Sequence, residues 1–249
     1  MAESFGTDAE RYDRSRPRYP DALVGRIVAE SPGPDVLDVG CGTGIVARQL
    51  QAAGCRVSGV EPDARMADLA RQHGIEIDVA TFEAWDPDGR AFDAVVAGQA
   101  WHWVDPVAGA AKAAQALRTG GILAVFWNAA ELPADLREAF AAVRRELAPE
   151  LPDLGGMSAV EAYLRMCARA ADGVAAAGGF GDSRQWRFDW KQPCTRDQWL
   201  DQLPTTGFYT QMAPDKLASV LVRTGAAIDA VGGSFTIDYS TVALVATRT

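Results

Sequence analysis

Residues 36–44 read VLDVGCGTG, and this stretch decides the fold class. A short apolar run ends in three glycines at alternate positions, and residues 45–53 then follow a helical pattern that closes at Gly54. A strand that runs through glycines into a helix brings bare backbone N–H groups and a helix N-terminus against a ligand. The stretch therefore predicts a ligand-binding unit of strand, turn and helix.

The same alternation continues on both sides of this unit. Apolar runs at residues 35–39, 56–60, 92–97 and 121–127 have the length and content of buried strands, and helical patterns at 63–73 and 107–117 separate them. Repeated strand–helix–strand units require crossover connections and produce a parallel sheet with helices on both faces. We therefore expect an α/β fold with a doubly wound, Rossmann-like sheet.

The second half of the chain changes pattern. Two consecutive helices are predicted at 133–147 and 159–171, and we interpret residues 129–183 as an inserted helical cover. Strand patterns return at 185–190 and 235–247, with helix candidates between them at 195–203 and 214–231. A length of 249 residues fits one large α/β domain, so we expect residues 1–249 to form a single domain.

Composition excludes several classes of partner. The net charge of −9 and the pI near 4.8 argue against nucleic acid, because no summed positive field is available for phosphates. Four cysteines and two histidines lack the spacing of a disulfide framework or a metal site. The polar N-terminal stretch and the lack of a long apolar run predict a cytoplasmic protein with no membrane segment.

The spacing of the glycines discriminates between nucleotide cofactors. A dinucleotide-binding turn has the pattern G-x-G-x-x-G, whereas Gly40, Gly42 and Gly44 form G-x-G-x-G and Ile45 occupies the place of the third glycine. Glu61 lies 21 positions after Gly40, at the end of the second strand, where a carboxylate can accept both ribose hydroxyls. An NAD-dependent oxidoreductase is therefore the less favoured alternative.

Three motifs together resemble those of class I S-adenosylmethionine-dependent methyltransferases: VLDVGCGTG at 36–44, VEPD at 60–63 and FDAVVAGQAWHWVD at 92–105. YDRSRPRYP at 12–20 and QAWHW at 99–103 are similar to the trans-aconitate methyltransferase branch, which acts on small molecules. The resemblance implies a seven-stranded sheet whose last strand is antiparallel, and residues 234–248 fit that strand.

The resemblance also implies roles for individual residues in binding S-adenosylmethionine. It implies that the methionine part of the cofactor lies on the glycine turn and that an acidic residue binds the ribose. It also implies that residues of two later loops border the adenine, and that an N-terminal segment folds over the bound cofactor. The implied cofactor-binding residues are Tyr12, Arg16, Asp38, Gly40, Cys41, Gly42, Gly44, Glu61, Pro62, Met66, Thr81, Phe82, Glu83, Gln99 and Trp101. For Glu61 the alternative is a solvated carboxylate at a helix N-terminus, and for Met66 and Phe82 it is a place in the core.

Residues 99–105 form the second group of candidate functional residues, because they follow the fourth strand at the edge where ligands of α/β sheets bind. Trp101 and Trp103 offer flat faces to a sulfonium or a substrate, and the alternative is that one of them, Trp103, closes the core above the sheet. His102 is the candidate general base, with the orientation of its loop as the alternative role. Trp127 and Tyr163 are candidates to line an acceptor pocket with these tryptophans.

The sequence thus favours an S-adenosylmethionine-dependent methyltransferase that acts on a small molecule by in-line displacement, a reaction that needs no metal. A protein that binds S-adenosylmethionine without transferring its methyl group is the main alternative. The expected assembly is a monomer or a homodimer.

Overall fold

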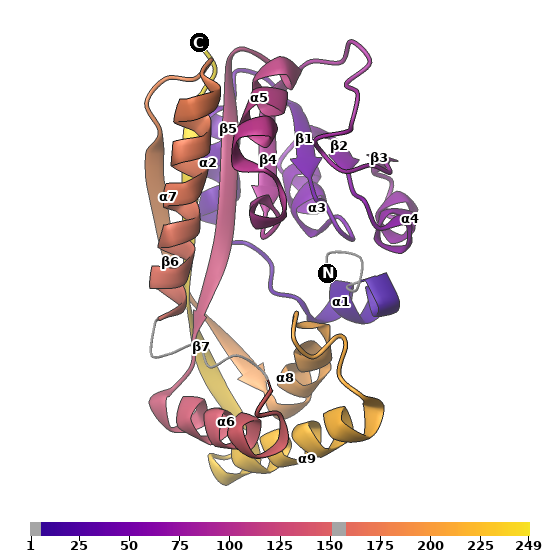
Figure 1. The fold of residues 1–249 in the computed structure, drawn as a ribbon, viewed down its shortest axis with the longest axis vertical. Helices are drawn as coiled ribbons and strands as arrows, with labels where there is room; N and C mark the ends of the chain where they lie inside the picture. The colour runs from indigo at the N-terminus through magenta and orange to yellow at the C-terminus, as the bar shows by residue number, and fades with distance from the viewer. Residues whose placement is uncertain (1–5, 151–157) are drawn as a thin grey trace.

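A computed structural model describes residues 6–150 and 158–249 of the chain. Its centre is a seven-stranded sheet in the order β3-β2-β1-β4-β5-β7-β6 (Figure 1). Strands β1 to β5 are parallel, and β7 runs antiparallel to both β5 and β6. The expected doubly wound sheet with an antiparallel last strand is confirmed. The strands are β1 Asp35–Val39, β2 Arg56–Val60, β3 Glu76–Asp78, β4 Phe92–Gly98, β5 Leu117–Glu131, β6 Arg184–Thr195 and β7 Ser234–Thr247.

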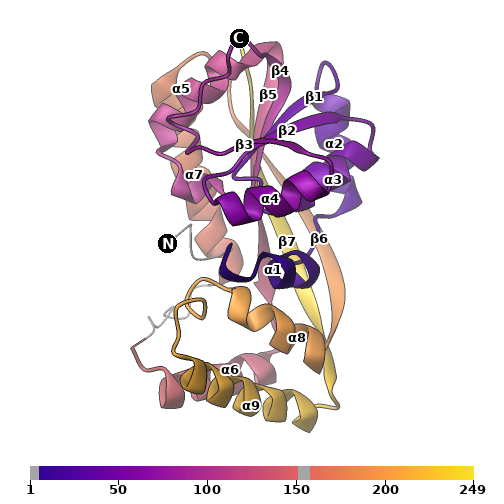
Figure 2. The ribbon, with the colours of Figure 1, turned by 90° about the vertical axis from the view of Figure 1, so that its right-hand side faces the viewer.

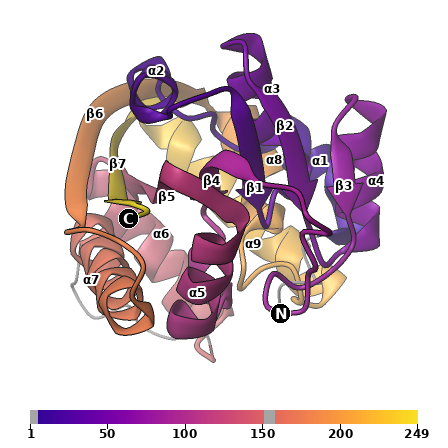
Figure 3. The same cartoon turned by 90° about the horizontal axis from the view of Figure 1, so that it is seen from above.

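Helices cover both faces of the sheet (Figure 3). One face carries α2 Asp21–Glu30, α3 Ile45–Ala52 and α4 Ala64–Gln72, and the other carries α5 Pro106–Ala116 and α7 Ala159–Ala177. Helix α5 begins where expected, because the Asp105 carboxylate accepts from the N–H groups of Val107 and Ala108 and a proline follows it. Two apolar layers therefore fix β1 and β4 from both sides.

Strands β5 and β6 are longer than the sequence pattern predicted, whereas the bounds of β7 agree with the prediction to within one residue. β5, β6 and β7 extend past the other strands and carry a second group of helices, α6 Ala134–Leu147, α8 Arg196–Gln202 and α9 Pro214–Ala230 (Figures 1 and 2). A small apolar cluster around Ile237 and Tyr239 packs beneath them. Helix α1, Ala9–Ser15, lies between this group and the ends of the parallel strands (Figure 2).

The two helices of the segment 129–183 lie on different parts of the molecule. α7 packs along α5 and against β5 and β7, whereas α6 packs against α9. The buried residues Cys167, Ala170 and Val174 join α7 to the sheet. α7 is thus a helix of the sheet face rather than part of a cover, and the elements that face the strand ends include α8, which lies outside the segment.

No helix in the described ranges combines the length and the apolar content that a membrane crossing requires.

Candidate active site

The glycines in the turn between β1 and α3 are required for two different structural reasons. Gly42 has φ +56°, and a Cβ placed on it would meet nothing closer than Met66 Cε at 3.9 Å. Gly44 has φ +84°, and its Cβ would lie 2.3 Å from Ile75 Cδ1. A side chain at Gly44 would therefore collide with the core, whereas Gly42 borders open space that a ligand can fill. Packing alone explains Gly44, while Gly42 is free to approach a ligand.

Asp38 is a buried acid that lacks a well-placed hydrogen-bond donor among the described residues. It sits near the end of β1 with 1% of its surface exposed, and within the described ranges neither carboxylate oxygen has a hydrogen bond of normal geometry. Burial, and then the charge of Glu61, raise the pKa of Asp38 to about 8, although the backbone N–H of Ala47 acts in the opposite direction. A buried carboxylate without a partner is costly, so this site calls for a cationic or hydrogen-donating ligand.

Glu61 lies beside the same turn, at the end of β2. Its Oε2 accepts from the N–H of Gly42 at 2.8 Å, and its Oε1 accepts from the N–H of Asp63 at 2.9 Å. Only 7% of the side chain is exposed, so the alternative of a solvated surface carboxylate is wrong. Burial raises the pKa of Glu61, and the two backbone N–H groups partly oppose this shift.

A cavity of about 60 Å³ opens at this turn and gathers residues from four separate segments. Seven of its lining residues were predicted from the sequence: Tyr12, Arg16, Asp38, Gly40, Cys41, Gly42 and Gln99. Seven further lining residues were not predicted from the sequence: Pro17, Tyr19, Thr43, Ile45, Val46, Gly98 and Asn128. Asn128 had a detectable signal, because it is the first polar residue after the apolar run of β5.

Helix α1 is fastened over this cavity by one carboxylate. Asp13 accepts from the hydroxyl of Thr43, in the glycine turn, at 2.7 Å and from Arg48 of α3. His73 Nε2 lies 3.7 Å from it. Although burial raises the pKa of Asp13, its hydrogen bonds from Arg48 and Thr43 lower that pKa overall. The N-terminal segment is therefore held against the glycine turn.

Two predicted cofactor residues turn out to lie largely in the core. The Cys41 side chain is buried and packs against β2, since a Cβ on Gly59 would lie 2.7 Å from its Sγ. Phe82 is buried, with its ring 6.0 Å from that of Trp85 and 6.0 Å from that of Trp101. Cys41 nevertheless lines the cavity at the glycine turn.

Four further residues predicted to contact the adenine lie in the segments that follow β2 and β3. Met66 is buried beside the glycine turn, and Pro62 is half-buried at the end of β2. Thr81 and Glu83 are exposed in the loop after β3, and Glu83 accepts from the N–H of Asp105 at 2.8 Å. These positions leave the adenine contacts as predictions.

Gln99, directly after β4, is held in an unusual conformation. It has φ +57°, which is uncommon for a residue with a side chain, and its N–H donates to the carbonyl oxygen of Phe126 at 2.8 Å. Its Oε1 is buried and finds no partner among the described residues. Strain of this kind concentrates at functional sites, so Gln99 is a strong candidate to contact a ligand.

His102 lies in a row of aromatic side chains on the α7 side of the sheet. The indole Nε1–H of Trp127 donates to His102 Nδ1 at 3.2 Å, and the Trp127 ring stacks on Tyr163 with centroids 6.3 Å apart. The hydrogen bond assigns the lone pair to Nδ1, so the proton of neutral His102 is on Nε2. Burial lowers the pKa of His102 to about 4.

The two tryptophans beside His102 have opposite environments. Trp101 is 3% exposed and packs on Gly109, where a Cβ would lie 3.3 Å from the indole, while Trp103 is 45% exposed. The expectation that Trp103 closes the core is wrong, because the short 3-10 helix Trp101–Trp103 turns Trp101 inward instead. The indole Nε1 of Trp101 is buried without a partner in the described part of the chain.

Comparison with known proteins places this geometry in context. Residues 12–152 match the family model described as a methyltransferase domain, which is more than half of the chain. An uncharacterized methyltransferase of Mycobacterium tuberculosis is 37% identical over 131 residues, covering 51% of this chain and 53% of that protein. A malonyl-[acyl-carrier protein] O-methyltransferase of Enterobacter lignolyticus is 32% identical over 152 residues, covering 57% and 59%. The chain thus spans little more than half the length of these curated relatives.

A solved structure supports the fold over nearly the whole chain. A protein classed as a type II methyltransferase, from Anaeromyxobacter dehalogenans, superposes with a TM-score of 0.66 at 21% identity, over 94% of this chain and 97% of that one. The sheet order, the glycine turn with its two acids and the match over residues 12–152 lead to one conclusion. The chain belongs to the methyltransferase-domain family, a family of S-adenosylmethionine-dependent methyltransferases.

Proposed function

We propose that the protein transfers a methyl group from S-adenosylmethionine to a small-molecule acceptor by in-line displacement. The observation that carries this proposal is Asp38, a buried carboxylate that receives no hydrogen bond of normal geometry in the described ranges, beside the open face of Gly42. An acid in this state fits the ammonium group of the cofactor's methionine part. The seven strands between residues 35 and 247 share one sheet, which supports the further proposal of a single domain.

The residues around the turn fit the rest of the cofactor. Glu61 uses each carboxylate oxygen once, and an ionised carboxylate offers about four acceptor sites, so both oxygens remain available to ribose hydroxyls. Gly40, Gly42 and Gly44 shape the turn, and Tyr12 would close over it. Pro62, Met66, Thr81, Phe82 and Glu83 are proposed to border the adenine.

Bound S-adenosylmethionine supplies an activated methyl group, which the acceptor's nucleophilic atom takes as the S–C bond breaks and the electron pair stays on sulfur. The protein's contribution is to position the acceptor and to exclude water. Helix α1, held by Asp13, covers the turn, and the conformation of Gln99 points to a positioning role at the end of β4. We propose that Trp101, Trp103, Trp127 and Tyr163 border the substrate on the side of the sheet that carries α7.

We assign His102 to positioning rather than to general-base catalysis. A base with a pKa of about 4 is neutral at pH 7 but is a poor proton acceptor, because an effective base has a pKa near the working pH. Its Nδ1 is also engaged by Trp127. The hydrogen bond instead orients the loop of residues 99–105 against β5.

The test of the proposed function is the release of S-adenosylhomocysteine. Purified protein is incubated with S-adenosylmethionine and a broad panel of small acceptors, and S-adenosylhomocysteine is quantified by mass spectrometry. Acceptor-dependent release supports a methyltransferase. Tight cofactor binding without release for any acceptor would instead favour a protein that only binds the cofactor.

A further inference from the structure

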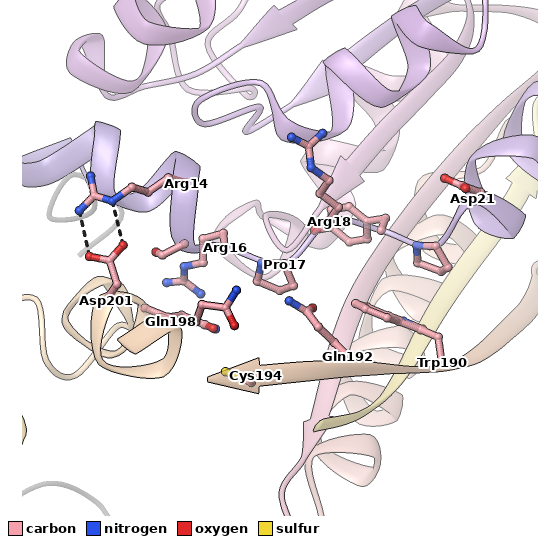
Figure 4. Close-up of a pocket in the computed structure, with 14 residues that line it drawn as sticks. Arg14, Arg16, Pro17, Arg18, Asp21, Trp190, Gln192, Cys194, Gln198 and Asp201 are labelled. Carbon is pink, nitrogen blue, oxygen red and sulfur yellow. Dashed lines mark hydrogen bonds and ion pairs between the residues drawn. The ribbon is translucent and has the colours of Figure 1, made fainter. Parts of the chain in front are cut away.

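A second and larger cavity lies next to the cavity at the glycine turn. It measures about 470 Å³, is open to solvent on one side, and is lined by residues 14–21, β6 and α8 (Figure 4). Its volume is in the usual range for small-molecule sites, about 300–1,000 Å³. Arg16, Pro17 and Tyr19 line both cavities, so a molecule in the larger one lies directly across this segment from the glycine turn.

Arg16 and Arg18 both line this cavity without an acidic partner in the described ranges, but Arg18 is exposed, whereas a larger part of Arg16 is buried. Its guanidinium donates to the carbonyl oxygen of Thr205, while its Nε is buried without a partner and no ion pair reaches it within the described ranges. By contrast, Asp201 accepts two hydrogen bonds from Arg14, at 2.8 and 2.9 Å. Asp21 lies at the end of the cavity far from Arg16 (Figure 4). A partly buried guanidinium without a carboxylate favours an anion from outside the chain.

The opposite wall adds further donors and a flat surface. Gln192 and Trp190 project from β6 toward Pro17 (Figure 4), and no hydrogen bond reaches the side-chain amide of Gln192 within the part of the chain described. The side-chain oxygen of Gln198 accepts a hydrogen bond from the N–H of Thr195 at 2.9 Å, which leaves its NH₂ group as a donor. Trp190 is held rigid by stacking on Tyr239, with ring centroids 4.3 Å apart.

We propose that this cavity binds the methyl acceptor, and that the acceptor carries an oxyanion. Arg16 and the amide of Gln192 would hold the oxyanion, and Trp190 would support the carbon skeleton. A guanidinium and amide donors match the planar oxygens of a carboxylate or the oxygens of a phosphate. This inference rests on the proposed function, and it places acceptor recognition on β6 and α8 rather than on residues 129–183.

The test measures binding to the complex with S-adenosylhomocysteine, so that the cofactor site is filled. Malonate, citrate and glycerol 3-phosphate are titrated by calorimetry, with dimethyl malonate as the uncharged counterpart of malonate. The variant Gln192→Glu introduces a carboxylate at the cavity, and Gln185→Glu makes the same change at an exposed position of β6 outside it. Thermal unfolding of each variant confirms that it folds.

We expect at least one anion to bind the wild type and Gln185→Glu with equal affinity. The same anion should bind Gln192→Glu about tenfold more weakly or not at all, and dimethyl malonate should bind none of the three proteins. Binding of malonate or citrate alone identifies a carboxylate site, and binding of glycerol 3-phosphate alone identifies a phosphate site. If S-adenosylhomocysteine binds but no anion does, or if Gln192→Glu binds the anion as well as Gln185→Glu, the inference is wrong. Failure of S-adenosylhomocysteine itself to bind overturns the proposed function and the acceptor role with it.

Discussion

The backbone N–H of Gly42 donates to Glu61 Oε2 at 2.8 Å, which ties the turn after β1 to the end of β2. The second carboxylate oxygen of Glu61 holds the N–H of Asp63 at the start of α4. The buried carboxylate of Glu61 thus fixes the shape of the glycine turn, and its oxygens can also accept hydrogen bonds from ribose hydroxyls. Its removal should affect both the fold and the site.

We predict that Glu61→Ala weakens the binding of S-adenosylhomocysteine by roughly 1.5–3 kcal/mol, the range for hydrogen bonds to charged groups. The same variant should lower the free energy of unfolding, since two backbone N–H groups lose their acceptor. Calorimetry and chemical denaturation measure the two effects. Glu76→Ala, at an exposed position of β3, is the control and should change neither. Wild-type affinity in Glu61→Ala would remove Glu61 from the cofactor site.

Asp38→Asn should make the ligand-free protein more stable above about pH 8. The pKa of Asp38 is raised from 3.8 to about 8 in the folded state, so between these values the unfolded chain ionises this group while the folded protein keeps it protonated. Stability therefore falls as the pH rises through this range. Asparagine does not ionise, so its advantage in melting temperature should grow from about pH 4 to about pH 8. The variant should bind S-adenosylhomocysteine more weakly. An advantage that does not change with pH would contradict the account of Asp38.

His102→Gln should retain turnover, because a positioning side chain can be replaced by another that accepts a hydrogen bond from Trp127. The folded pKa of His102, about 4, lies below the ordinary value of 6.5, so the neutral ring stabilises the fold above pH 6.5 and this stability is lost as the pH falls toward 4. The variant should lack that acid-side loss in melting temperature. Loss of turnover at every pH, with wild-type cofactor affinity, would show that His102 is catalytic.

Asp13→Asn should loosen α1. The change removes the charge that attracts Arg48 and weakens the hydrogen bond with Thr43. Hydrogen exchange of residues 9–15, followed by mass spectrometry, should accelerate relative to wild type, while the exposed control Glu10→Gln leaves it unchanged. Equal exchange rates in all three proteins would mean that Asp13 does not fasten the helix.

The fold could be predicted in large part because its signals are local. The run at 36–44 carries its own glycines, and the start of α5 carries both its N-cap Asp105 and the proline after it. The lengths of β5 and β6 could not be predicted in the same way. Their extensions pair with β7 far from the parallel strands, and polar residues such as Asn128 and Gln192 interrupt the apolar pattern there.

Parts of the candidate site depend on packing that no local pattern records. Trp101 turns inward because Gly109, eight positions later, leaves space for its indole, whereas the neighbouring Trp103 stays exposed. The larger cavity joins Arg16 near the N-terminus to Gln192 of β6, more than 170 positions later. Such juxtapositions follow from the sheet order, so only the folded chain reveals them.

The most direct measurement of the central claim is calorimetry of the wild-type chain with S-adenosylhomocysteine and, separately, with NAD. The glycine spacing, with Ile45 where a dinucleotide turn has its third glycine, and the unpartnered Asp38 predict binding of S-adenosylhomocysteine at micromolar strength and no binding of NAD. Binding of NAD at micromolar strength, with no heat from S-adenosylhomocysteine, would contradict the account.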